Sequence, residues 1–145
     1  ELCTQHGVDV VYISNHGGRQ LDHGLGSIEV LPEIVEAVAG RARVVIDGGF
    51  LRGTDILKAL ILGADMVALG KLQAIAVGAA GEAGVHRMLE ILEEEISIDM
   101  KLLGVNKLDD LDASYLTNAQ PTEAPSVFST FPLLRYWGMR EKGEL

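Results

Sequence analysis

This chain has few cysteines, no long apolar run and few basic residues, and each of these shortages argues against one class of protein. Cys3 is its single cysteine, which excludes an internal disulfide and suits a reducing compartment, so we predict a cytoplasmic protein. No apolar run approaches the ~20 residues that cross a bilayer, so no transmembrane segment is expected. Basic residues number 12 against 21 acidic ones, for a formal net charge of −9, and they form no cluster. This balance argues against binding to nucleic acid.

Metal and nucleophile motifs are also missing. His6, His23 and His86 have no cysteine or carboxylate at the spacing of metal ligands, so no metal is predicted. Ser14 is not in a Gly-x-Ser-x-Gly context, which argues against a nucleophile elbow. Residues 93–95 are three consecutive glutamates, which we interpret as a solvated helix face.

What the chain does contain is apolar sequence interrupted by glycine. Hydrophobic residues make up 48% of the 145, enough for one globular domain, and 17 glycines fit many tight turns. Three short apolar runs stand out: Val8–Ser14, Arg43–Asp47 and Asp65–Leu69. Continuous β-branched and aliphatic runs of this length predict strands buried on both faces, as in a parallel sheet.

Helical patterns fill the gaps between these runs. Pro32 is a good first residue for a helix that stops at Gly40, and Thr54 is a plausible N-cap for a helix over Asp55–Leu62. A third helix is predicted from apolar residues at helical spacing: Val85, Met88, Leu89, Leu92 and Ile96. The order is therefore strand then helix, three times.

A repeated phrase supports this reading. Residues 7–11 and 63–67 both read Gly-x-Asp-x-Val, as expected where a helix ends at glycine and a strand follows. Repeated βα units favour a (β/α) barrel or a doubly wound sheet. Three units cannot close an eight-stranded barrel, which takes about 250 residues. Because Glu1 falls inside a helical pattern, we expect a fragment or processed product whose remainder lies on another polypeptide.

Two regions are predicted along the chain. Residues 1–108 carry the βα units, and from residue 109 to 145 the periodicity fades. Asn118–Pro132 holds three of the four prolines, which is typical of a linker or an arm laid over a neighbour. The apolar residues near its end suggest subunit contacts and a homo-oligomer, with a loose tail as the alternative.

The first run is followed directly by residues that suit acid–base chemistry. In a parallel α/β fold, the loop after a strand lies at the edge where ligands bind. Two glycines separate His16 from Arg19, so both side chains can face one cavity. Histidine takes a proton near neutral pH, and the arginine fork holds a carboxylate. Spacing alone leaves open a plain turn with a surface arginine and a hydrogen-bonded histidine.

The next two loops suit a phosphate group. Asp47-Gly48-Gly49 follows the second run, and Arg52 adds a charge where a helix begins. Gly70-Lys71 follows the third run and supplies a second close backbone approach with a cation. The alternative is a pair of ordinary βα turns.

These motifs resemble those of the FMN-dependent α-hydroxy acid oxidases and dehydrogenases. Ser14–Gln20, which reads Ser-Asn-His-Gly-Gly-Arg-Gln, matches that family's signature, and Asp47–Asp55 with Lys58–Leu60 resembles its next segment. Similarity runs from Gly7 to Gly104. The resemblance implies a TIM (β/α)8 barrel, of which this chain supplies the last three units, with FMN at the carboxyl ends of the strands.

The resemblance also implies roles for individual residues. His16 would be the active-site base and Arg19 would bind the substrate carboxylate. The flavin's phosphate and ribityl side would be lined by the second and third loops: Asp47, Gly48, Gly49, Arg52, Gly70 and Lys71.

Two departures from the family pattern concern the phosphate end. The family usually has Gly-Arg-Pro where this chain has Gly70-Lys71-Leu72, and Val/Ile-Arg-Arg where it has Phe50-Leu51-Arg52. The first loses a bidentate fork, and the second loses one basic residue. The family's flavin-ring lysine, substrate tyrosines and base-orienting aspartate lie upstream of this sequence.

The implied reaction is FMN-dependent oxidation of a small L-2-hydroxy acid to the 2-keto acid. Its partners would be that substrate and the amino-terminal remainder of the barrel, without which the chain is expected to be inactive. Two alternatives stay open. One is a non-catalytic half-barrel that serves as an assembly piece, and the other is a different FMN barrel enzyme, such as an isomerase or an IMP-dehydrogenase-like protein.

Overall fold

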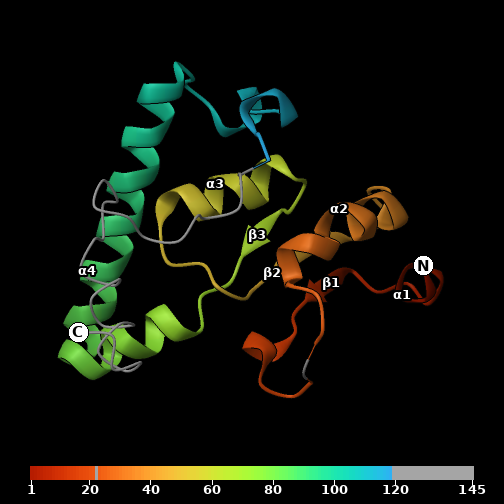
Figure 1. The fold of residues 1–145 in the computed structure, drawn as a ribbon, viewed down its shortest axis with the longest axis horizontal. Helices are drawn as coiled ribbons and strands as arrows, with labels where there is room; N and C mark the ends of the chain where they lie inside the picture. The colour runs from red at the N-terminus through yellow and green to blue at the C-terminus, as the bar shows by residue number, and fades with distance from the viewer. Residues whose placement is uncertain (22, 119–145) are drawn as a thin grey trace, which may run out of the picture.

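The computed structural model describes residues 1–21 and 23–118, and its elements alternate between strands and helices (Figure 1). In chain order they are α1 (Leu2–Gln5), β1 (Val10–Ile13), the 3-10 turn η1 (His16–Gly18), α2 (Ser27–Val38), β2 (Arg43–Ile46), α3 (Gly53–Ile61), β3 (Met66–Val67), α4 (Lys71–Leu103), η2 (Leu108–Asp110) and η3 (Ala113–Tyr115). The predicted order of three strand–helix units is confirmed. Most of the predicted carboxyl-terminal arm, residues 119–145, lies outside the described residues.

The three strands form one parallel sheet in the order β1-β2-β3. Val10 pairs with Arg43 and Ile13 with Ile46, so β1 and β2 are aligned along their whole length. Val45 pairs with Met66 to begin the shorter contact between β2 and β3. The α/β class with a parallel sheet is confirmed, and the carboxyl ends of all three strands meet at one edge.

The two faces of this sheet differ in burial. One face packs on the helices and forms the core, which contains Ile13, Val44 and Ile46 from the strands together with Leu31, Val38 and Ala59 from α2 and α3. On the other face Val10, Tyr12 and Met66 are 46%, 53% and 61% exposed. The prediction of strands buried on both faces is therefore wrong for this chain, because side chains alternate along each strand and only one set meets the helices.

Helix α2 begins earlier than predicted. It starts at Ser27, and Pro32 lies inside it, so the prediction that Pro32 opens the helix is wrong. The start is fixed upstream, where the backbone N–H of Gly26 donates to Glu29 Oε2 at 2.6 Å. A glutamate that reaches back three residues satisfies a donor at the helix start.

Helices α3 and α4 also differ from the expected bounds. Helix α3 starts at Gly53 rather than after Thr54, because Asp55 Oδ2 accepts from the backbone N–H groups of Leu51 and Arg52 at 3.1 Å each. The predicted third helix forms the second half of α4, beyond a break at residues 80–81. None of the helices in residues 1–21 and 23–118 has both the length and the apolar character that crossing a membrane requires.

The repeated Gly-x-Asp-x-Val phrase has a structural role in its second copy. Asp65 Oδ2 accepts from the backbone N–H of Val44 at 2.8 Å, and Oδ1 pairs with Arg43 Nη1 at 2.6 Å. These bonds, with the backbone bond first among the causes, lower the pKa of Asp65. A lowered carboxyl pKa stabilises the fold above the ordinary value of about 4, and this contribution is lost as the pH falls through the lowered value.

We therefore expect Asp65→Asn to lower the free energy of unfolding at pH 7 by roughly 1 kcal/mol, a figure kept small because the pair is partly exposed. Chemical denaturation across pH checks this, and the difference from wild type should shrink below about pH 4. Asp9→Asn is the matched control, since Asp9 is bonded to the sheet through its backbone carbonyl, which accepts from Arg43 N at 2.8 Å. A difference that stays constant down to low pH would contradict the assignment.

Candidate functional site

A cleft of about 690 Å³ lies at the carboxyl ends of the three strands. The loops that follow the three strands line this cleft, and the amino-terminal turn of α2 closes one side of the cleft. Seven of the eight predicted site residues are brought together there: His16, Arg19, Asp47, Gly48, Gly49, Gly70 and Lys71. The cleft arises because parallel strands direct their connecting loops to one edge.

The loop after β1 is folded on itself by local hydrogen bonds. The side chain of Asn15 accepts from the Gly18 N–H at 3.2 Å and donates to the Leu25 carbonyl at 3.2 Å. His16 has a φ of 54°, and the His16 N–H donates to Ser14 Oγ at 3.1 Å. Because histidine tolerates left-handed backbone better than most residues, and the positive φ values that follow fall on Gly17 and Gly18, this sequence can hold the turn. It places His16 at the cleft with its side chain exposed.

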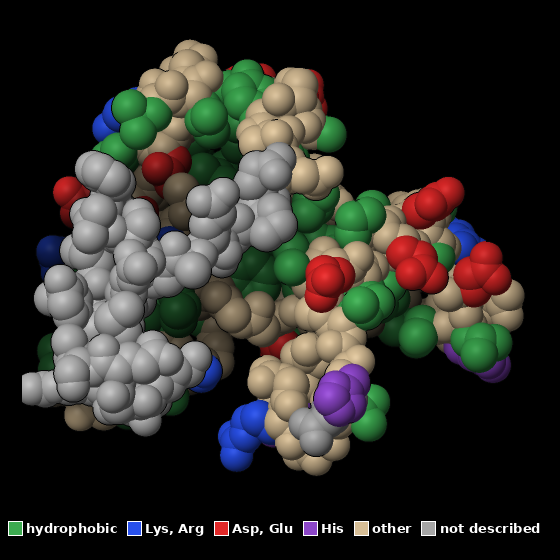
Figure 2. Space-filling view, in the orientation of Figure 1, with side chains coloured by type: hydrophobic (Ala, Val, Ile, Leu, Met, Phe, Trp, Pro, Cys, Tyr) green, Lys and Arg blue, Asp and Glu red, His purple; other side chains and the backbone are tan. Residues whose placement is uncertain are grey.

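Charge is unevenly distributed around this loop. Figure 2 shows basic and histidine side chains on the projecting loop between β1 and α2, whereas acidic side chains gather over α2. Within the cleft lining, Arg19 and Lys71 are the cations and Asp47 is the carboxylate. The cleft therefore offers two positive charges in a chain whose net charge is −9. This distribution suits an anionic ligand.

The loop after β2 requires glycine at one position. Gly48 has a φ of +103°, and a Cβ there would lie 2.7 Å from Ser27 Oγ. Ser27 Oγ itself donates to the Asp47 carbonyl and so ties this loop to α2. At Gly49, by contrast, a Cβ would meet nothing within 4 Å. Gly48 thus closes the turn, and Gly49 leaves open space on which a ligand can approach the backbone.

The loop after β3 leads straight into a long helix. Lys71 is the first residue of α4 and is exposed, and Gly70 before it has open space where a side chain would stand. The first backbone N–H groups of a helix are unpaired within the helix and carry its positive dipole end. Backbone donors and a lysine at one point suit a phosphate oxygen.

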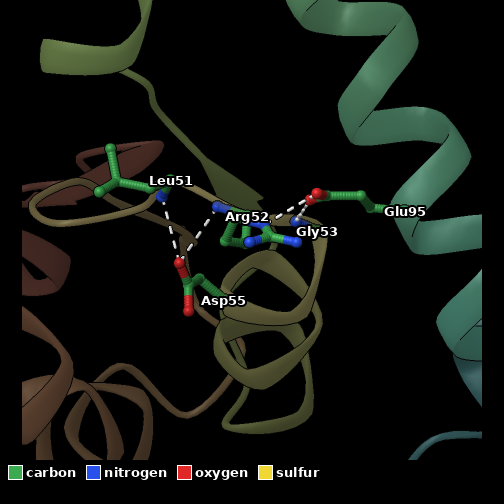
Figure 3. Close-up of polar contacts among 5 residues, drawn as sticks. All are labelled: Leu51, Arg52, Gly53, Asp55 and Glu95. Atoms are coloured by element: carbon green, nitrogen blue, oxygen red, sulfur yellow. Dashed lines mark hydrogen bonds and ion pairs between the residues drawn. The ribbon is translucent and has the colours of Figure 1, made fainter. Parts of the chain in front are cut away.

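Arg52 is the one predicted site residue that the structure does not bring into the cleft. Its Nε donates to Glu95 Oε1 at 2.8 Å, and Glu95 Oε2 accepts from the Gly53 N–H at 2.7 Å (Figure 3). Leu51, the residue before it, lines the cleft instead. The backbone N–H groups of Leu51, Arg52 and Gly53 are thus bound to Asp55 and Glu95.

Glu95 is a residue whose role the sequence interpretation missed. The reading of residues 93–95 as a solvated helix face is wrong for Glu95, whose side chain is 23% exposed. The signal was present, because Glu95 stands seven residues after buried Met88 and three after buried Leu92. That spacing places it on the stripe of α4 that faces α3. The close approach is also visible at Gly53, where a Cβ would lie 2.7 Å from Glu95 Cβ.

We expect Glu95→Ala to lower the free energy of unfolding by about 1–2 kcal/mol, because it leaves the part-buried Gly53 N–H without its acceptor. The figure is discounted because the Arg52 side chain is 69% exposed. Thermal or urea denaturation measures the effect. Glu94→Ala, an exposed neighbour on the same helix, should change stability by less than about 0.5 kcal/mol. Equal losses for the two variants would show that the bonds of Glu95 to Arg52 and Gly53 contribute nothing to stability.

Tyr12 is a second residue that the sequence interpretation did not identify. It lies on the exposed face of β1, and its hydroxyl donates to Asp47 Oδ2 at 3.0 Å. Desolvation first, and then the hydrogen bond to the Asp47 carboxylate, raise the pKa of Tyr12. The phenol therefore stays protonated and acts as a donor near neutral pH. No sequence motif marks this pair, which is 35 residues apart.

In residues 1–21 and 23–118, no group of three or more His, Cys, Asp or Glu side chains is arranged to hold a metal ion. Among the described residues that line the cleft are one histidine, two cations, one carboxylate and open glycine backbone. Such a set can bind an anion, accept hydrogen bonds from hydroxyls and move a proton.

The family model for FMN-dependent dehydrogenases matches residues 1–118. An L-lactate oxidase from Nostoc sp. is 47% identical over 116 residues, which cover 79% of this chain and 31% of that protein. The 2-hydroxyacid oxidase 1 of Mus musculus is 49% identical over 110 residues, which cover 76% of this chain and 30% of that protein. The chain thus spans about a third of the length of the relatives it matches.

The chain is also similar to part of solved structures of mandelate oxidase. A structure of mandelate oxidase with benzoyl-formic acid superposes with a TM-score of 0.72 at 43% sequence identity. The match covers 75% of this chain and 32% of that one. Another, solved with 3,3-difluoro-2-hydroxy-3-phenylpropionic acid, has the same TM-score of 0.72.

Proposed function

The chain belongs to the FMN-dependent dehydrogenase family, and on that premise we propose that it is the carboxyl-terminal portion of an enzyme that oxidises a small L-2-hydroxy acid to the 2-keto acid. The observation that carries the proposal is the cleft, where a histidine, an arginine and two glycine-rich loops converge at the ends of parallel strands. Its similarity to 2-hydroxyacid oxidases and lactate oxidase supports the substrate class.

The whole enzyme is proposed to be a (β/α)8 barrel, with residues 1–108 as its last three units and residues 109–145 as an arm. The one-sided burial of the sheet supports a barrel over a doubly wound sheet, in which helices cover both faces. In a barrel, the exposed side chains Val10, Tyr12 and Met66 would point inward, where the remaining strands bury them. The amino-terminal remainder is therefore the first partner we propose.

The cleft fits FMN by the chemistry of its groups. Asp47 Oδ1 is buried and has no hydrogen-bond partner among the described residues, so it suits a hydroxyl of the ribityl chain. Gly48 closes the turn that presents Asp47, while Gly49 and Gly70 leave their backbone accessible and Lys71 supplies a cation, which suits the phosphate. When bound, FMN would supply the two-electron redox chemistry.

The chain's own residues would then bind and deprotonate the substrate. Arg19 would hold the carboxylate of the hydroxy acid through two parallel hydrogen bonds and so fix its orientation. His16 would take a proton from the substrate, either from the hydroxyl or from the α-carbon. Both side chains lie on the short loop after β1, so substrate position and proton acceptor are fixed by one turn.

Arg52 would not contact the phosphate directly. Its guanidinium binds Glu95. Arg52 would therefore affect phosphate binding only by holding the backbone of the loop after β2, in which the neighbouring Leu51 lines the cleft. The phosphate end would rely on Lys71, a point charge without the bidentate fork of arginine.

The visible absorption spectrum of the natively purified protein, with the intact mass of every polypeptide present, tests the proposal. A flavin spectrum that is bleached anaerobically by lactate, glycolate or mandelate is the expected result, together with a polypeptide that supplies the other strands. A colourless protein that contains this 15.6 kDa chain alone would overturn it in favour of a non-catalytic assembly piece.

A further inference from the structure

The two oxygens of the Asp47 carboxylate have different surroundings. Oδ2 accepts a hydrogen bond from the Tyr12 hydroxyl at 3.0 Å. Oδ1 is buried and has no partner within the described residues. A buried carboxylate oxygen without a donor is costly, so it marks a place where a donor from a ligand is favoured.

The rest of Asp47 is already held in place. Its backbone N–H donates to the Ile13 carbonyl at 3.0 Å, and its carbonyl accepts from Ser27 Oγ. These bonds come from β1 and α2, and Tyr12 adds a third from the exposed face of β1. Three of the four polar groups of Asp47 are therefore satisfied by the protein. The fourth, Oδ1, belongs to a residue that lines the cleft.

Tyr12 is well suited to control which oxygen of Asp47 is left without a hydrogen-bond partner. Its hydroxyl is a donor to the carboxylate, and Tyr12 is not among the described residues that line the cleft, so the contact through which it would influence a ligand there is the one with Asp47. Without that bond, the carboxylate could rotate about χ2, a broad torsion for aspartate. An oriented acceptor is worth more than a rotating one, because less conformational entropy is lost on binding.

We propose that Tyr12 is a positioning residue for the cofactor: its hydroxyl holds Oδ2 of Asp47 so that Oδ1 is presented to a hydroxyl on the ribityl chain of the flavin. This inference rests on the proposed function, in which Asp47 lines the ribityl side of an FMN site. It assigns no proton transfer to Tyr12.

The test compares two flavin probes on the natively assembled protein after removal of its cofactor. Riboflavin carries the ribityl chain, and lumiflavin has the same ring without it. Tyr12→Phe should weaken riboflavin binding about three- to tenfold, the range for one lost hydrogen bond, and leave lumiflavin binding unchanged. Quenching of flavin fluorescence gives both dissociation constants. Equal weakening of both probes, or no weakening of riboflavin binding, would overturn the proposal.

Two further variants separate this proposal from the one on which it rests. Asp47→Asn replaces one carboxylate oxygen with an amide donor and should weaken riboflavin binding, and adding Tyr12→Phe to it should weaken binding no further. If Asp47→Asn has no effect on binding, the assignment of Asp47 to the cofactor fails. If it weakens binding but Tyr12→Phe does not, only the role of Tyr12 fails. Tyr115→Phe, on η3 and outside the cleft lining, is the matched control.

A measurement without flavin tests the contact itself. In the wild-type protein, desolvation first and then the Asp47 carboxylate raise the pKa of Tyr12, so its ring carbon signal should titrate at a pH above the ordinary range of a tyrosine. In Asp47→Asn this elevation should decrease. An unchanged titration of Tyr12 in that variant would show that the two side chains are not bonded, and the proposal would be overturned.

Discussion

His16→Asn is expected to slow flavin reduction by the hydroxy acid roughly 10²- to 10⁴-fold while the flavin stays bound. The proposed base is lost, but asparagine tolerates the left-handed backbone that His16 adopts at a φ of 54°, so the loop should keep its shape. Anaerobic stopped-flow mixing with substrate measures reduction, and the visible spectrum measures bound flavin.

The control for this variant is His86→Ala. His86 lies on α4 near Glu82, outside the cleft lining, and its loss should leave reduction within about twofold of wild type. Reduction of the His16→Asn protein at the wild-type rate would remove His16 from the reaction. Loss of the flavin together with activity would instead mean that the loop after β1 holds the cofactor.

Arg19→Ala is expected to lower kcat/KM for the hydroxy acid about 10²- to 10³-fold, because two charge-assisted hydrogen bonds to the carboxylate are lost. Arg19→Lys should recover part of this loss, since lysine keeps the charge but not the fork. The amide of the same acid lacks the negative charge, so its slow reaction should respond far less to either change.

Arg87→Ala is the matched control for Arg19. Arg87 pairs with Glu90 on α4 at 3.0 Å and does not line this cleft. Steady-state kinetics with both substrates give the comparison. If Arg19→Ala affects the acid and its amide equally, Arg19 supports the loop rather than the carboxylate.

Much of the fold could be predicted because its signals are local. The three strands were recognised from apolar runs, and the helices between them from apolar spacing and glycine stops. The parallel sheet and its shared edge then followed from repeated βα units, whereas the order of the strands within the sheet was not predicted. Helix starts were predicted less well, because caps such as Glu29 on Gly26 and Asp55 on Leu51 depend on side-chain hydrogen bonds that compete with proline and threonine signals.

The site was predictable to the extent that it is built from contiguous motifs. His16 and Arg19 reach the cleft because the tight turn at the two glycines between them keeps both residues at the edge of the sheet where β1 ends. Gly48, Gly49 and Lys71 also come shortly after a strand, at the same edge of the sheet. Arg52 looked equivalent, since it too is a cation beside a glycine at the start of a helix, yet Glu95 binds it away from the cleft.

The sequence by itself determined the order of elements, the edge of the sheet where ligands bind and the residue types available there. The tertiary structure alone decided which cation faces the cleft and which oxygen of Asp47 has no hydrogen-bond partner among the described residues. Those outcomes depend on the bonds of Arg52 to Glu95 and of Tyr12 to Asp47, whose partners are 43 and 35 residues apart. Local periodicity can place Glu95 on the buried stripe of α4, but it does not identify the partner in either pair, because such pairs form only when packing brings separate elements together.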